Sequence, residues 1–123
     1  ILIKTLVKEL KLKVNIIGCK TIREDDGLAM SSRNKLLSIK ERKIARNIIR
    51  LLKKAKQLYK NSTLKETKSE IFKDAKLIKN LNLEYFEILD LSMISDFLEE
   101  EEEIRAFIAC KVGKIRLIDN III

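Results

Sequence analysis

The stretch from Ile104 to Asp119, IRAFIACKVGKIRLID, constrains the fold of this chain more than any other part of the sequence. Its first nine residues are almost continuously apolar, as in a central strand that is covered on both faces. Gly113 and Lys114 then provide a two-residue turn into a second strand. Upstream, the segment LNLEYFEILD is rich in β-prone aromatic and aliphatic residues. The sequence therefore predicts a three-stranded antiparallel sheet from about residues 83–90, 104–112 and 115–119.

Two predicted helices precede this sheet, and each is opened by a capping box. Ser38 and Glu41 have the required spacing, and so do Thr63 and Glu66. The first helix is expected to run to about residue 59, where its apolar periodicity ends. The second directs an apolar stripe inward, formed by Ile71, Phe72, Ala75 and Ile78. The fold class is therefore α+β, with the helices packed on the three-stranded antiparallel sheet.

The first 20 residues have a different pattern from the rest of the chain. Ile3, Leu6, Val7 and Leu10 recur at the spacing of a buried helical stripe. The short β-prone run 14–17 then ends at Gly18. A helix followed by a buried strand is half of a βαβ unit, whose sheet would come from elsewhere. The pattern is already under way at Ile1, so we expect this chain to be the C-terminal part of a longer protein.

The loop REDDGLAMSSRN, residues 23–34, carries the candidate chemistry. Ser31, Ser32, Arg33 and Asn34 are consecutive donors, and adjacent hydroxyls with a guanidinium fork suit the oxygens of a phosphate. Gly27 would let the backbone turn sharply or approach a ligand. The alternative is structural: Ser31 caps a helical turn, and Arg33 pairs with one of the loop carboxylates, Asp25 or Asp26.

The charge of the chain bears on its partners. The net charge is +8, and residues 1–60 carry 17 Lys and Arg against 5 Asp and Glu. A segment this basic suits a phosphate-bearing partner. Aromatic residues make up only 5% of the chain and are not interleaved with the basic ones, so no base-stacking surface is visible. We do not expect nucleic-acid binding, although a basic nucleotide- or RNA-binding module without catalysis is the alternative function.

The His and Cys content and the lengths of the apolar runs narrow the class of protein further. His is absent, and Cys19 and Cys110 form no metal-ligand cluster, so no residue is assigned as a metal ligand. No apolar run is long enough to cross a bilayer and no secretory signal is present, so a cytoplasmic protein with no membrane partner is expected. In that setting we expect two buried, structural thiols and no disulfide. The acidic run Glu99 to Glu103 is expected to be a solvated helix end or loop.

Two motifs resemble one enzyme family. The segment TIREDDGLAMSSRNKLLSIKER, Thr21 to Arg42, closely resembles the signature of pantothenate synthetase (pantoate–β-alanine ligase), T-V-R-E-x-D-G-L-A-M-S-S-R-N-x-Y-L-x-x-x-E-R. The segment VGKIRLIDN, Val112 to Asn120, resembles the closing motif of the same family. The order and separation of the two motifs also agree, and between them they cover about a quarter of the chain.

The resemblance implies a reaction and a site. The family uses ATP to adenylate pantoate, releasing pyrophosphate, and β-alanine then attacks the pantoyl adenylate to give pantothenate and AMP. Carried over, Ile22 would contact adenine through its backbone and Met30 would line the nucleotide pocket. Ser31, Ser32 and Arg33 would hold the triphosphate, and Ser32 and Arg33 would also be catalytic. Mg²⁺ is implied by the ATP chemistry alone, and a homodimer is expected for the full-length enzyme.

The resemblance also implies a domain division. Residues 1–20 would be the last helix and strand of a Rossmann-like nucleotide-binding domain. Residues 21–123 would form the C-terminal lid domain, with an ATP-contacting loop at residues 22–34. Leu36 stands where the family usually has Tyr, and Asp25 where a small residue or Pro is common. The family's His-containing motif and its pantoate-binding residues match no part of this chain, so we expect the chain alone to be inactive.

Overall fold

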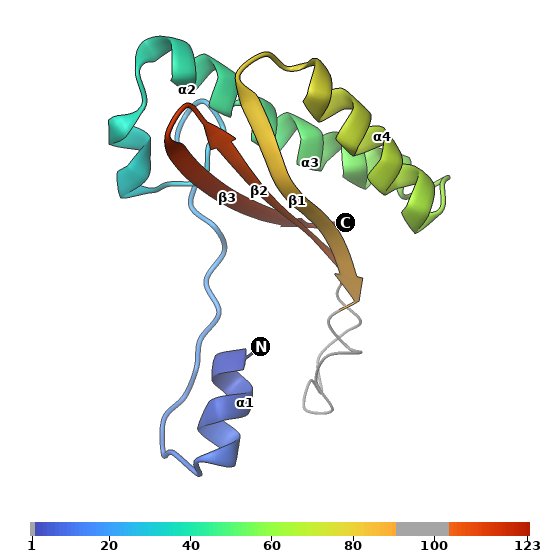
Figure 1. Ribbon diagram of the computed structural model, residues 1–123. Coiled ribbons are helices and arrows are strands. Elements are labelled where there is room, and N and C mark those ends of the chain that lie inside the picture. The colour runs from blue at the N-terminus through green and yellow to red at the C-terminus, as the bar shows by residue number, and fades with distance from the viewer. Residues whose placement is uncertain (1, 91–103) are drawn as a thin grey trace.

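The sheet is a three-stranded antiparallel meander at the C-terminal end of the chain (Figure 1). The computed structural model describes residues 2–90 and 104–123. Strands β1 (Leu81–Asp90), β2 (Ile104–Val112) and β3 (Ile115–Ile122) lie in the order β1-β2-β3. The turn between β2 and β3 is the predicted Gly113-Lys114 pair, and Gly113 has a φ of 57°, which favours glycine. The α+β fold class and the three predicted strands are therefore confirmed.

β3 is longer than predicted. It continues to Ile122, whereas the sequence pattern ended it at residue 119. Ile121 pairs with Ala106 and lies against the core, as does Ile123. Ile122 alternates to the opposite side and is 49% exposed. The apolar C-terminus thus extends the sheet and helps to close the core.

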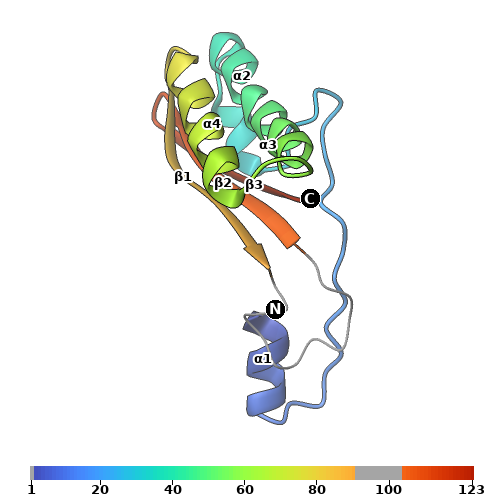
Figure 2. The same cartoon turned by 90° about the vertical axis from the view of Figure 1, so that its right-hand side faces the viewer.

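Three helices cover one face of the sheet (Figure 2). These are α2 (Ile39–Ala45), α3 (Asn47–Leu58) and α4 (Leu64–Leu77). Both predicted capping boxes are present: Ser38 and Glu41 open α2, and Thr63 and Glu66 open α4. The fully buried side chains include members of both layers: Phe86, Ile108 and Val112 from the sheet, and Ile48, Leu52 and Ile71 from the helices.

The single helix predicted from Ser38 to about residue 59 is interrupted, and that prediction needs correction. α2 ends at Ala45 and α3 begins at Asn47. The Asn47 side-chain amide donates to the Ile44 carbonyl at 2.8 Å. A side-chain amide of this kind competes with the backbone for a helical carbonyl, which gives a physical reason for the break.

The N-terminal segment forms the predicted helix but not the predicted strand. α1 (Leu2–Glu9) is followed by residues 12–20 without regular structure, so the strand at residues 14–17 is wrong for this chain. Val14 is 54% exposed and Ile17 is 84% exposed. A strand needs a hydrogen-bonded neighbour, and the described residues place none beside this segment. The assignment of residues 1–20 to a separate domain stays a prediction.

The two cysteines differ in environment, which corrects half of the expectation. Both are free thiols. Cys110 is buried in β2, whereas Cys19 is exposed in the irregular segment 12–20. Burial raises the pKa of the Cys110 thiol to about 12, with a smaller contribution from the charge of Glu84.

This difference predicts selective thiol chemistry. A disulfide reagent at mildly alkaline pH should modify one cysteine per folded chain and two per unfolded chain, because only Cys19 offers an accessible sulfur. The reaction is followed by the absorbance of the released thiol. A Cys19→Ser variant serves as the control and should show no fast phase. Rapid modification of Cys110 in that folded variant would contradict the burial of β2.

The described residues contain no helix long and apolar enough to span a membrane. The acidic run Glu99 to Glu103 lies outside the described residues.

Candidate functional site

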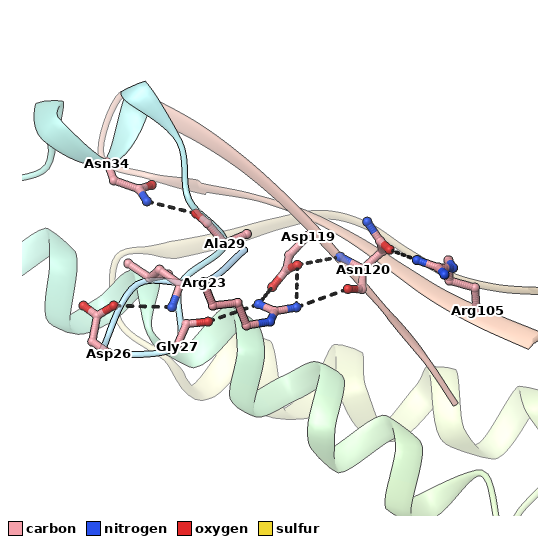
Figure 3. A network of polar contacts seen from close by, with 9 residues as sticks. Arg23, Asp26, Gly27, Ala29, Asn34, Arg105, Asp119 and Asn120 are labelled. Carbon is pink, nitrogen blue, oxygen red and sulfur yellow. Dashed lines mark hydrogen bonds and ion pairs between the residues drawn. The ribbon is translucent and has the colours of Figure 1, made fainter. Parts of the chain in front are cut away.

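The loop at residues 22–30 is a small hairpin that lies beside β3 (Figure 3). Arg23 and Ala29 form an isolated antiparallel bridge. The Glu24 N–H donates to the Leu28 carbonyl at 2.8 Å, and the Met30 N–H donates to the Ile22 carbonyl at 2.9 Å. The Ile22 N–H has no acceptor among the described residues. The Ile22 N–H is therefore one of several backbone donors of the hairpin that make no hydrogen bond within the described residues.

The tip of the hairpin is fixed by packing and by glycine. The Leu28 side chain is 4% exposed and belongs to the hydrophobic core. Gly27 has a φ of 89°, and a Cβ atom there would lie 3.4 Å from a side-chain carbon of Ile49 in α3. Only glycine adopts this backbone conformation without strain. The predicted need for glycine at this turn is confirmed.

The donor run after the hairpin enters a short 3₁₀ helix, η1 (Ser32–Leu36). The Ser31 hydroxyl caps it by accepting the Arg33 N–H at 3.2 Å. The Asn34 side chain is buried and donates inward, to Glu24 and to the Ala29 carbonyl at 3.0 Å. Asn34 is therefore a structural residue that ties the 3₁₀ helix to the hairpin, and not a free donor as the sequence suggested.

Arg33 does not make the ion pair that the structural interpretation of the loop expects. Its side chain is exposed, and within residues 2–90 and 104–123 it has no ion-pair partner. Asp26 pairs instead with Arg42 in α2. The structural alternative is thus right about the Ser31 cap and wrong about Arg33. An exposed guanidinium beside two hydroxyls keeps its donors available for an anion.

Arg42 pairs with two of the three carboxylates of the hairpin. Its guanidinium binds Glu24 at 2.5 Å and Asp26 at 2.7 Å. The hydrogen bonds from Asn34 and Arg42 lower the pKa of Glu24. Burial acts to raise the pKa of Asp26, but the hydrogen bonds from Arg42 and from the Leu28 N–H outweigh it, and the pKa is lowered. The pKa of Arg42 is raised in turn by Glu24 and Asp26.

These pairs predict an acid-sensitive hairpin. The ordinary pKa values are 4.5 for Glu24 and 3.8 for Asp26, and both are lower in the folded chain. Their contribution to the free energy of unfolding is therefore present above those values and is lost as the pH falls through the folded pKa values. Urea unfolding at pH values stepped from neutral to about 3 should show this loss.

Arg42→Gln should remove part of that pH dependence, because the carboxylates then have no guanidinium partner. Lys43→Gln is the matched control, since Lys43 is the neighbouring exposed cation and has no ion pair in the part of the chain described. An unchanged pH profile in Arg42→Gln would count against the pairing.

On its other side, the hairpin is held by an ion pair to the sheet. Arg23 binds both carboxylate oxygens of Asp119 in β3, at 2.8 and 3.0 Å (Figure 3). The Asp119 side chain is 4% exposed and the Arg23 side chain 25%. Arg23 within the hairpin thus binds it to β3, and Arg42 binds it to α2.

Two open hollows flank the loop, and their linings differ in charge. One, of about 390 Å³, is lined by three carboxylates of the hairpin together with Arg23, Arg42 and Met30. The other, of about 320 Å³, lies over the open face of the sheet, and its lining residues include Met30, Ser31, Arg33, Tyr85, Phe107 and Ile118. We call this second hollow the sheet-side hollow. An anion is favoured there, because a guanidinium and a hydroxyl face it and its carboxylate, Asp119, is already paired.

The structure brings together most of the predicted site residues. Met30, Ser31 and Arg33 line the sheet-side hollow, Ser32 is exposed next to them, and Ile22 is 66% exposed at the edge of the hairpin. Within residues 2–90 and 104–123, no group of three or more His, Cys, Asp or Glu could hold a metal ion.

Sequence reasoning did not identify Arg23, Arg42 and Asp119. The available signal was their charge. Asp119 interrupts the alternating apolar positions Ile115, Leu117 and Ile121, and the hairpin carries three carboxylates that need cationic partners.

Comparison with known proteins places this geometry in a family. The fold and the loop define an α+β domain with an exposed donor segment, and a family model described as pantoate-beta-alanine ligase matches residues 1–122. Pantothenate synthetase from a Sulfurihydrogenibium species is 39% identical over 124 residues, which are 97% of this chain and 44% of the relative. The corresponding protein of Bacteroides thetaiotaomicron is 39% identical over 123 residues, covering 98% and 43%. The chain therefore belongs to the pantoate–β-alanine ligase family.

Solved structures of the same family resemble this chain in fold. Pantothenate synthetase from Thermus thermophilus matches with a TM-score of 0.83 and 27% identity, over 97% of this chain and 44% of that one. Pantoate-beta-alanine ligase from Francisella tularensis, solved with beta-gamma ATP and beta-alanine, matches with a TM-score of 0.65 and 32% identity, over 98% and 38%. The chain thus spans less than half the length of these relatives.

Proposed function

We propose that this chain is the ATP-facing C-terminal portion of a pantoate–β-alanine ligase. The observation that carries the proposal is the exposed guanidinium of Arg33, which makes no ion pair within the described residues and lines the sheet-side hollow with Ser31 and Met30. The solved Francisella relative holds an ATP compound and beta-alanine, which supports ATP as the nucleotide. The same proposal includes a cytoplasmic location and a homodimer of the complete enzyme. It also includes the division into two domains between residues 20 and 21.

The reaction has two steps in this proposal. A carboxylate oxygen of pantoate attacks the α-phosphorus of ATP, and the bond to the bridging oxygen breaks, so that pyrophosphate leaves. The amine of β-alanine then attacks the carbonyl carbon of the adenylate, AMP leaves, and the nitrogen loses a proton. Negative charge grows on pyrophosphate in the first step, and cationic donors placed beside it lower the barrier.

The loop residues divide this work. The Ile22 N–H and the side chain of Met30 receive the adenine end of the nucleotide. Ser31 accepts the Arg33 N–H, which leaves its own hydroxyl hydrogen to donate to a phosphate oxygen. Ser32 and Arg33 bind the β- and γ-phosphates and stabilise the departing pyrophosphate. Mg²⁺ would arrive bound to the ATP phosphates. Glu24 and Asp26 of the hairpin already form ion pairs with Arg42 and are not available as metal ligands.

The isolated chain should bind ATP without completing the reaction. It spans 44% of the Sulfurihydrogenibium relative, so more than half of that enzyme has no counterpart in this chain. An NMR titration with ATP tests the binding half of the proposal. Amide shifts should change at Ile22 and at Met30 to Arg33, with no comparable change in α4.

A chimera tests the catalytic half. This chain replaces the matching region of the Sulfurihydrogenibium enzyme, and pantothenate formation is measured from ATP, pantoate and β-alanine. Activity in the chimera and none in the isolated chain is the expected result. Salt-sensitive RNA binding without a preference for ATP would instead favour the basic binding module.

A further inference from the structure

Asp119 is a buried carboxylate on β3 that faces the hairpin and not the solvent. The residue is 7% exposed, and both of its side-chain oxygens accept hydrogen bonds from the Arg23 guanidinium, at 2.8 and 3.0 Å (Figure 3). This bidentate geometry fixes direction as well as distance. The pair therefore sets the orientation of the Arg23 side chain on the sheet.

The same guanidinium also donates hydrogen bonds to two backbone carbonyl oxygens. It donates to the Gly27 carbonyl at the tip of the hairpin, at 3.0 Å, and to the Asn120 carbonyl on β3, at 3.3 Å. Arg23 thus joins its own position at the start of the hairpin, the tip of the hairpin and the strand. One side chain therefore links the start and the tip of the hairpin to the strand.

The strand end of this connection is itself rigid. The Asn120 N–H donates to an Asp119 oxygen at 2.7 Å. The Asn120 side-chain oxygen accepts from Arg105 of the neighbouring strand β2, at 2.5 Å. The carboxylate is therefore fixed by two paired strands, and the hairpin takes its position from the sheet.

We propose that Asp119 is a positioning residue for nucleotide binding, which acts through Arg23 to hold the ATP-contacting edge of the hairpin in place. Arg23 is the direct neighbour of Ile22, and the Ile22 carbonyl accepts the Met30 N–H. Rotation of Arg23 away from β3 would move the edge of the hairpin, together with the donor run that follows Met30. Asp119 itself keeps its oxygens on Arg23 and does not contact the nucleotide.

The test compares variants of this chain by ATP titration and by hydrogen exchange. Asp119→Asn keeps the size of the side chain and removes its charge, leaving Arg23 partly buried without a counterion. We expect about a tenfold loss of ATP affinity and faster exchange at the amides of Glu24 and Met30. Exchange in β2 should stay as in the unmodified chain, which separates a displaced hairpin from general unfolding.

Two further variants sharpen the assignment. Arg23→Lys keeps the cation but loses the bidentate fork, so it should lose ATP affinity to a similar extent, and the double variant should lose little more. Glu84→Gln is the matched control. Glu84 in β1 pairs with Arg116, which is in β3 like Asp119, but this pair lies away from the hairpin. Its ATP affinity should not change.

The outcomes are separable from those of the proposed function, on which the ATP readout rests. Unchanged ATP affinity in Asp119→Asn, in a chain whose unmodified form binds ATP, would overturn the positioning role and leave the ligase proposal standing. Absence of ATP binding in the unmodified chain would overturn the ligase proposal, and hydrogen exchange would then decide alone. Unchanged exchange of the hairpin amides in Asp119→Asn would overturn the positioning role in either case.

Discussion

Replacing Arg33 with alanine should weaken ATP binding to this chain at least about tenfold, because it would remove the charge-assisted hydrogen bond to phosphate that we propose for this residue. In the catalytic chimera the adenylation step should fall further, by about a hundredfold or more, since charge grows on pyrophosphate in the transition state. The structure supports a specific effect at this position. Arg33 is exposed and, within the described residues, makes no ion pair, so its removal leaves the fold intact.

Lys35→Ala is the matched control for this prediction. Lys35 lies two residues further along the same 3₁₀ helix and is also exposed, but it does not line the sheet-side hollow. If positive charge in general attracts the nucleotide, the two variants should lose similar affinity, and both losses should shrink with added salt. A much larger loss in Arg33→Ala, in both affinity and adenylation rate, is the result that supports a direct phosphate contact.

Truncating Phe86 to alanine should lower the free energy of unfolding by about 3–5 kcal/mol. Phe86 in β1 is fully buried between the sheet and its helices, and it pairs with Ile108 in the neighbouring strand β2. The change combines the lost burial of an aromatic ring with a cavity that the surrounding strands cannot fill. A loss this large is a substantial fraction of the whole stability of a domain of this size. Urea unfolding followed by circular dichroism measures it.

Leu89→Ala on the same strand is the control. Leu89 is 38% exposed, so its truncation removes less buried surface and leaves no closed cavity. Its cost should be well below that of Phe86→Ala. Equal costs at the two positions would mean that the covered face of the sheet has been assigned wrongly.

The site was only partly predictable, and the residues show why. Ser31, Ser32 and Arg33 could be predicted as phosphate-binding residues because three adjacent donors are a local pattern. Asn34 belongs to the same run, yet the structure turns it inward to Glu24 and the Ala29 carbonyl. Whether a donor faces solvent or the protein depends on what packs against it, and the sequence around Asn34 does not contain that information.

Local features were determined by the sequence alone. Both capping boxes and the Gly113-Lys114 turn formed where they were predicted, because each depends on residues within a few positions of one another. The three strands were found for a similar reason, since their apolar and β-prone runs are contiguous. The family resemblance likewise rests on two contiguous motifs.

Tertiary structure alone decided the rest. Arg23 and Asp119 are separated by 96 positions, and neither residue type announces its partner. Residues 14–17 carry a strand-like pattern and remain without regular structure, because a strand is completed by hydrogen bonds to a neighbour that the described chain does not place there. A capping box supplies both of its own partners, whereas an ion pair across the sheet or a paired strand exists only when the folded chain brings the second partner to it.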